Sequence, residues 1–322
     1  MSMESDVIVD RRRLRRKLTF WRVAAVIIAI AAIGIIAIIA SPGGRGAFTS
    51  SDSIARVTIE GLIRSDRDRV EALERLEKSR YAAVIVHINS PGGTTAGSEQ
   101  LYDSLTRLKA KKPMAVVVEG LAASGGYITA IAADHIVAQQ SSLVGSIGVL
   151  FQYPNFSGLL KTVGVQVEEV KSSPLKAAPN GFEPTSPEAR DALDSLVKDS
   201  YAWFKGLVKA RRGMSDEELA KVSDGRVFTG HQAVGLKLID ELGDEKTAIT
   251  WLVQHKGVKK GLPVRDYKLA PRFGDLTFLR AAASTTLNAL GLSAIARQVN
   301  GSAIDRFALD GMLALWQPAA AN

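Results

Sequence analysis

Short strands that are apolar on almost every residue constrain the fold of this chain more than any other feature. The clearest are AAVIVHI at residues 82–88 and MAVVVE at residues 114–119. A strand with one face in water alternates apolar and polar side chains, whereas a strand that is apolar throughout is covered on both faces, as parallel strands between helices are. The chain is therefore predicted to contain an α/β domain built on a parallel sheet.

Helical patterns alternate with these strands. The first half is predicted to run βαβαβ, with strands at 54–63, 82–88 and 114–118 and helices at 66–79 and 96–111. Three further helices are predicted downstream, the first buried and the other two amphipathic, at 125–133, 187–212 and 244–256. Because no internal repeat interrupts the pattern, we expect one α/β domain over residues 54–257.

The pattern changes in the last part of the chain, residues 258–322. This stretch is basic at Lys259 and Lys260, continues with the amphipathic run FLRAAASTTLNALGLSAIARQV and ends with the apolar MLALWQP. We expect this C-terminal amphipathic extension to pack on the core. The alternative is a surface for a partner or for the membrane face.

An uncharged stretch, VAAVIIAIAAIGIIAIIA at residues 23–40, predicts one transmembrane helix. As a helix its roughly 18 residues reach about 27 Å, close to the thickness of the hydrocarbon core. A cleaved signal peptide is the alternative, but its apolar region is usually shorter and ends in an Ala-x-Ala-like site. Residues 1–22 form a basic tail that the positive-inside rule places in the cytoplasm, and the Gly- and Ser-rich residues 41–53 are expected to form a flexible tether.

Composition argues against several function classes. The net charge is +8, but half of it comes from residues 1–22, and the remainder forms no basic run that would follow a phosphate backbone. Nucleic-acid binding is therefore not expected. The chain has no cysteine, so disulfides, thiolate metal sites and a cysteine nucleophile are excluded, and its four histidines show no zinc-site spacing. We expect no metal and no cofactor.

Three glycine-bearing loops follow predicted strands, where an open α/β sheet usually builds its site: residues 89–93, 122–126 and 145–148. In the first, glycines let backbone N–H groups approach a ligand, although the loop could equally be a tight turn. In the second, Ser124 precedes the buried helix, where a developing alkoxide is stabilised. Ser124 could also be only a helix N-cap. On spacing alone the third loop is another turn.

A serine nucleophile needs a base. His87 lies within an apolar strand and His135 at a helix-to-strand junction, so neither is a good candidate for the usual histidine. A neutral lysine is the other option, because burial can lower a lysine pKa from about 10.4 by the roughly 3 units that catalysis near neutral pH requires. Composition does not choose that lysine, but it would need burial and a polar partner.

An ordered set of motifs resembles the bacterial signal peptide peptidase A family in its short, single-domain form. The motifs are AAVIVHINSPGGTTAGSEQL, PMAVVVEGLAASGGYITAIAADHIVAQQSSLVGSIGVL, VEEVKSSPLKAA and DGRVFTGHQAVGLKLIDELG, and they cover nearly all of residues 54–256. The resemblance implies the fold of the Clp protease and crotonase group, built from stacked β-β-α units. It also implies a dome-like ring of eight subunits over the membrane.

The same resemblance assigns the site residues. It implies that Ser124 is the nucleophile, that Lys176 is the general base and that Ser146 hydrogen-bonds the lysine amine. Gly93 and Gly125 are expected to supply the oxyanion hole. In the short family form the serine and the lysine come from neighbouring subunits, so an isolated protomer would be inactive.

The function implied is cleavage of remnant signal peptides and other apolar peptides after signal peptidase has released them. The enzyme would be a single-pass protein of the inner membrane, with its peptidase domain on the extracytoplasmic side. Three alternatives remain: a related membrane-bound Ser/Lys protease acting on membrane-protein partners, a crotonase-like acyl-CoA enzyme, and a non-catalytic membrane scaffold in which the glycine loops are only turns.

Overall fold

The computed structural model describes residues 21, 24–25, 28, 53–269 and 313–315. Residues 53–269 and 313–315 belong to one compact unit. Most of the predicted tail, transmembrane segment and tether lies outside the described residues. Among the residues that are described, no helix is both long and apolar enough to cross a membrane.

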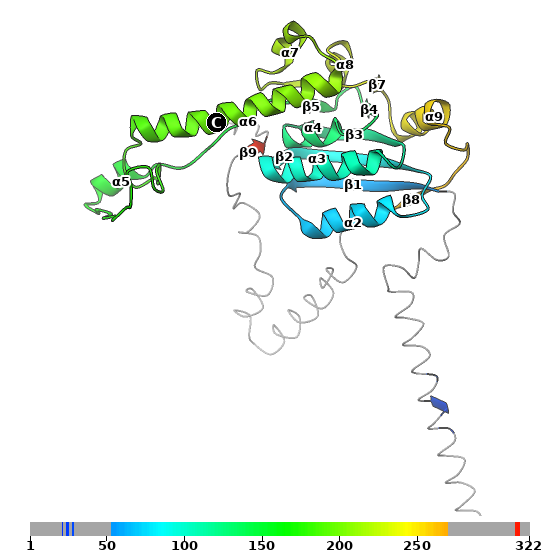
Figure 1. Ribbon diagram of the computed structural model, residues 1–322, viewed down its shortest axis with the longest axis horizontal. Helices are drawn as coiled ribbons and strands as arrows, with labels where there is room; N and C mark the ends of the chain where they lie inside the picture. The colour runs from blue at the N-terminus through cyan, green and yellow to red at the C-terminus, as the bar shows by residue number, and fades with distance from the viewer. Residues whose placement is uncertain (1–20, 22–23, 26–27, 29–52, 270–312, 316–322) are drawn as a thin grey trace, which may run out of the picture. The chain divides into compact units, whose positions relative to one another are not determined.

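A mixed, mainly parallel sheet forms the centre of the unit (Figure 1). Its longest strands are β1 (Ile54–Ile63), β2 (Ala83–Thr94) and β3 (Met114–Ala123), which pair in parallel in the order β3-β2-β1. Shorter strands extend or flank them: β4 (His135–Ala138), β5 (Leu143–Gly145), β6 (Val227–Thr229), β7 (Glu241–Leu242), β8 (Val264–Asp266) and β9 (Leu313–Leu315). The predicted α/β class is therefore confirmed.

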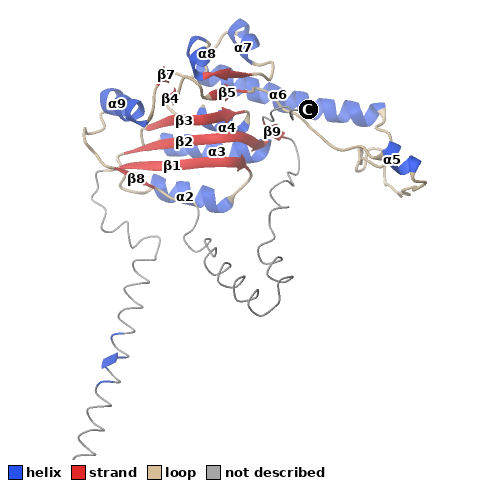
Figure 2. Ribbon diagram, turned by 180° about the vertical axis from the view of Figure 1, so that it is seen from behind, coloured by secondary structure: helices blue, strands red, loops and turns tan. Residues whose placement is uncertain are grey.

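Helices cover the sheet and extend beyond it. The described helices are α2 (Arg67–Glu77), α3 (Thr95–Lys109), α4 (Gly125–Ala130), α5 (Ser157–Thr162), α6 (Pro187–Arg212), α7 (Asp216–Val222), α8 (Gly230–Gly235) and α9 (Glu245–Lys256). Helices α2, α3 and α4 lie on one face of the strands, as Figures 1 and 2 both show. Helix α6 has the predicted bounds, because Ser186 caps its start and Gly213, with φ 59°, ends it.

The apolar runs are buried on both faces, as their composition predicts. Val84, Val86 and Ile88 of β2 pack in the cluster that holds the buried side chains of α2 and α3. The alternate residues Ala83 and Ile85 pack in a second cluster with side chains of α9. The period of two along a strand thus divides one continuous apolar run between two cores.

The extension predicted over residues 258–322 contributes two short strands. Strand β8 pairs in parallel with the start of β1, and β9 pairs in antiparallel with the end of β2. At these two places the extension packs on the sheet as strand. The FLRAAAS run lies outside the described residues.

His87 anchors a polar network on the α9 face of the sheet. Its Nδ1 lies 2.7 Å from Glu119 Oε1, and its Nε2 lies 2.7 Å from Glu245 Oε2. Arg56 of β1 donates to both carboxylate oxygens of Glu245, at 2.6 and 2.7 Å. The network joins β1, β2 and β3 to the first turn of α9, and its hydrogen bond from Arg56 holds the pKa of Glu245 below its usual range.

This network predicts an acid-dependent loss of stability. A carboxylate whose folded pKa is depressed stabilises the fold above its unfolded pKa of about 4.3, and this contribution is lost as pH falls through the folded pKa. We expect Glu245→Gln to lower the free energy of unfolding by about 1 kcal/mol at neutral pH and to flatten its decline in acid. Urea titrations across pH measure this. Asp266→Asn, which removes a more exposed partner of Arg56, should have a smaller effect, and equal effects would contradict the prediction.

Candidate active site

Ser124 lies at a strained turn between β3 and α4. Its backbone has φ 53° and ψ −115°, values that a residue with a side chain seldom adopts, and its side chain is buried. The backbone N–H donates to Gly145 O at 2.7 Å, and the carbonyl accepts from Tyr127 and Ile128 at 2.9 Å each. Strain of this kind persists only where the surroundings enforce it, and it is common at catalytic residues. The N–H groups of Gly125 and Gly126 begin helix α4 directly after Ser124, and the first N–H groups of a helix lack an intrahelical acceptor.

Ser146 lies next to Ser124 because β5 pairs with the end of β3. Ala123 is in register with Gly145, so the residues that follow each strand are neighbours. Ser146 also has a positive φ, 51°, is buried, and donates its N–H to Arg226 O at 2.8 Å. The structure thus brings these two predicted site residues to the same edge of the sheet.

The glycine turn after Ser90 forms the other wall of the site. Gly92 has φ 100°, and Gly93 pairs so closely with β1 that a Cβ added to it would lie 1.8 Å from Ile63 O. Ser90, which is fully buried, holds the turn: its Oγ donates to Gly61 O at 2.7 Å and accepts from Gly92 N at 3.1 Å. Sequence reasoning missed Ser90, because a serine in an SPGG turn gives no signal that distinguishes it from a loop residue.

Ser90 is expected to position the oxyanion donors. Ser90→Ala leaves Gly92 N–H and Gly61 O without this partner, so the turn should shift. We expect kcat to fall about tenfold to a hundredfold with little change in KM, because the misplaced N–H groups matter most in the transition state. Steady-state kinetics on a peptide ester measure this.

The matched control is Ser104→Ala, which removes another buried hydroxyl, one that donates to Gln100 O at 2.8 Å within α3. It should cost similar stability and leave kcat unchanged. A parallel loss of kcat in both variants would contradict the positioning role.

Lys176 is not brought to Ser124 within the single chain. It lies in the connection between α5 and α6, is exposed, and its amine has no hydrogen bond or ion pair with any described residue. Figures 1 and 2 both show α5 and the start of α6 projecting beyond the sheet; we call residues 151–196 the arm. Its exposed apolar side chains include Phe156, Leu159, Val163, Leu175, Phe182 and Leu196.

Strand β9 lies on the open edge beside the glycine turn. Strand β3 pairs with β2 only as far as Ser90, opposite Ala122, and Ser124 then turns into α4. Beyond that point β2 pairs with β9, with Gly92 opposite Leu315 and Gly93 opposite Ala314, in antiparallel register. The chain's own residues 313–315 therefore occupy the edge to which an extended peptide near Ser124 would add.

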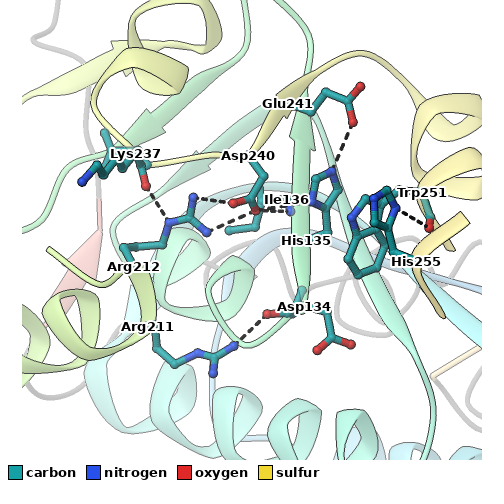
Figure 3. Close-up of polar contacts among 12 residues, drawn as sticks. Asp134, His135, Ile136, Arg211, Arg212, Lys237, Asp240, Glu241, Trp251 and His255 are labelled. Carbon is teal, nitrogen blue, oxygen red and sulfur yellow. Dashed lines mark hydrogen bonds and ion pairs between the residues drawn. The ribbon is translucent and has the colours of Figure 1, made fainter.

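The two histidines weighed as bases are engaged elsewhere. Both ring nitrogens of His87 contact carboxylates. The Nε2 atom of His135 lies 3.2 Å from Glu241 Oε2, and its ring stacks on Trp251 (Figure 3). Residue 135 begins β4, at the end of the sheet opposite the turn that holds Ser124. Among the described residues no group of His, Asp and Glu side chains could hold a metal ion.

Comparison with known proteins identifies relatives across most of this region. The model of "Peptidase family S49" matches residues 106–259, and that of "Clp protease" matches residues 64–142. The candidate protease slr0021 of Synechocystis sp. is 36% identical over 207 residues, which cover 64% of this chain and 75% of that protein.

Two longer relatives match a smaller part of their own length. Protease 4 of Haemophilus influenzae is 29% identical, with 68% of this chain and 37% of that protein covered. The chloroplastic serine protease SPPA of Arabidopsis thaliana is 32% identical, with 54% and 26% covered. The chain thus spans between about a quarter and three quarters of the relatives it matches.

Proposed function

The chain belongs to peptidase family S49 and is a serine peptidase, and from this premise we propose that it is a membrane-anchored endopeptidase that cleaves remnant signal peptides. In the proposal Ser124 is the nucleophile and Lys176 the base. The subunits form a ring of eight in the inner membrane, with the tail in the cytoplasm and the peptidase domain outside it. Family membership disfavours the scaffold and acyl-CoA alternatives.

The observation that carries the proposal is the setting of Ser124, a buried hydroxyl on a strained strand-to-helix turn beside a glycine turn. Its Oγ attacks the peptide carbonyl carbon while Lys176 Nζ takes the proton. The carbonyl oxygen becomes an oxyanion, which the N–H groups of Gly93 and Gly125 stabilise. The lysine then protonates the leaving amine, and water hydrolyses the acyl-enzyme with the lysine as base again.

The base is proposed to come from a neighbouring subunit. A lysine acts as a base only when neutral, and removal from water favours the neutral amine. Lys176 is exposed in the single chain, and α5, in the same arm, has no buried residue. Apolar side chains such as Phe156 and Leu159 would be covered if the arm packed against a second copy, and the same contact would bury Lys176.

The substrate is proposed to bind as an added strand along the glycine turn, where β9 now lies. A chain that ends at residue 312 should therefore cleave a peptide ester with a lower KM, severalfold below that of the full chain, because the edge of β2 is free. The control is a chain ending at residue 316, which keeps β9. An unchanged KM on removal of β9 would contradict competition for this edge.

The proposed substrate class is tested by reconstituting the full chain in vesicles and offering two purified peptides, a signal peptide released by signal peptidase and a polar peptide of equal length. We expect mass spectrometry to show cleavage of the signal peptide and little of the polar one, and Ser124→Ala to remove the cleavage. Equal rates for both peptides would refute the substrate class while leaving the peptidase activity intact.

A further inference from the structure

The edge of the sheet at which its parallel strands begin carries exposed cations. Strands β1, β2 and β3 all start at this edge, and α2, α3 and α9 end there because each helix runs back against the strands (Figures 1 and 2). The exposed basic side chains at or just after the ends of these helices are Lys78, Arg80, Lys111, Lys256, Lys259 and Lys260. We call these residues the basic edge.

Contacts show that the helix ends converge. Lys112 Nζ donates to two carbonyl oxygens that follow α2, at 2.8 and 3.0 Å, and so ties the end of α3 to the end of α2. Lys256 Nζ, at the end of α9, lies 3.3 Å from Asp134 Oδ1, and Asp134 N donates to Met114 O at 3.0 Å, so α9 ends beside the start of β3. The cations therefore form one surface although they come from separate segments.

Most carboxylates around this edge are already paired. Three ion pairs, two of which Figure 3 draws, engage the acidic side chains near β4: Asp240 with Arg212 at 2.8 Å, Glu241 with His135 at 3.2 Å, and Asp134 with Lys256 at 3.3 Å. By contrast, four cations of the basic edge have no ion-pair partner within the described part of the chain: Lys78, Arg80, Lys111 and Lys260.

The chain enters the domain at this same edge. Ser53 O accepts from Ala82 N at 2.9 Å, and Ile54 N donates to Pro263 O at 3.0 Å, so the domain begins between the starts of β2 and β8. A flexible tether of residues 41–53 would have a root-mean-square span of about 20 Å. If residues 23–40 span the membrane, the chain that leaves the lipid joins the domain at the basic edge.

We infer that the basic edge binds the anionic phospholipid headgroups of the membrane that holds the anchor. The inference rests on the proposed anchor. Basic residues in the last turn of a helix also complement its dipole, but Arg80, Lys259 and Lys260 lie after the ends of α2 and α9. Charge attraction acts within a Debye length of about 8 Å, so the tether makes it effective. Trp251, which is partly buried and also lies at this edge, suits a headgroup layer.

The inference has a geometric consequence for catalysis. Strand β3 runs from this edge to Ser124, and its ten residues span about 33 Å. With the basic edge on the headgroups, Ser124 faces away from the bilayer. A membrane-embedded peptide would then have to leave the bilayer before cleavage.

The test uses the absence of native cysteine. A fluorophore on Ala110→Cys, an exposed position at the end of α3, reports contact at the basic edge, and one on Asp68→Cys, in the first turn of α2, reports the opposite edge. The full chain is reconstituted in phosphatidylcholine vesicles and in mixed phosphatidylcholine and phosphatidylglycerol vesicles, each containing a headgroup-labelled quencher lipid.

We expect quenching at Ala110→Cys in the anionic vesicles only, its loss in high salt, and no quenching at Asp68→Cys. Arg80→Glu with Lys111→Glu should abolish it, whereas Lys221→Glu with Lys237→Glu, an equal charge change elsewhere, should not. Equal quenching at Ala110→Cys in both lipid mixtures would overturn the inference. So would the absence of quenching at this position when the chain is bound to the vesicles, as shown by its flotation with them. If the chain no longer floats with the vesicles after an alkaline wash, the anchor is refuted instead. Binding of the chain to added anionic vesicles at neutral pH would then test the basic edge by itself.

Discussion

Chains carrying Ser124→Ala or Lys176→Ala are each expected to lose peptidase activity by about ten-thousandfold or more, and a mixture of the two is expected to recover it. Each variant removes one member of a pair that acts as a unit, so the loss in each should approach that of the double variant. If the serine and the lysine of one site come from different subunits, random mixing gives intact sites in about a quarter of the positions. Turnover of an apolar peptide ester by co-refolded variants measures the recovery.

The control for this experiment is Ser142→Ala, which removes another buried serine, whose Oγ donates to Val118 O and Glu119 O rather than facing the site. It should retain turnover and labelling by a fluorophosphonate. Failure of the mixture to recover activity, with rings of normal size, would show that both groups act within one chain. Undiminished turnover in either single variant would remove that residue from the mechanism.

Gly93→Ala is expected to impair both the fold and the chemistry. The added Cβ would lie 1.8 Å from Ile63 O and 2.6 Å from Ile63 N and C, which are backbone atoms that cannot move aside without separating β1 from β2. We expect a loss of at least about 3 kcal/mol in the free energy of unfolding, and at least a hundredfold loss in kcat, because the proposed oxyanion donor is displaced. Urea unfolding and kinetics at low temperature measure the two effects separately.

Gly206→Ala provides the matched glycine control. Gly206 lies within α6, and an added Cβ there meets nothing within 4 Å. Alanine is the better helix former, so this variant should be unchanged or more stable by up to about 1 kcal/mol. Equal destabilisation at both positions would show that close approach to β1 is not what requires glycine at residue 93.

The type of each helix and strand could be predicted from the sequence, because periodicity and capping depend on residues that are neighbours in the chain. The apolar run of residues 82–88 predicts a strand covered on both faces, and the structure divides its side chains between two cores. Ser186 and Gly213 mark the ends of α6 through capping alone. Strand β2 continues to Thr94, beyond its predicted end, because the glycine turn also pairs with β1 and β9, and no local signal records these partners.

In the candidate site, too, the sequence predicted some features and only the fold decided the others. Motifs in the sequence selected Ser124, Ser146, Lys176 and the glycines, and the family they indicated is confirmed. The role assigned to each of these residues stays a prediction. Ser90 could not be recognised, because its role depends on Gly61 of another strand, 29 residues away. The partners of His87 are similarly distant, since Glu245 lies 158 residues further along the chain.

The sequence by itself determined the α/β class, the peptidase family and which residues are candidates for catalysis, since periodicity, capping and short motifs are properties of neighbouring residues. Only the tertiary structure decided which candidates meet: it placed Ser124 beside Ser146 and set β9 against the glycine turn. It left Lys176 exposed on the arm, without a hydrogen bond or ion pair to any residue that the structure describes. Such contacts arise when strands pair and helices pack, so they depend on residues too far apart in the chain for any local pattern to record.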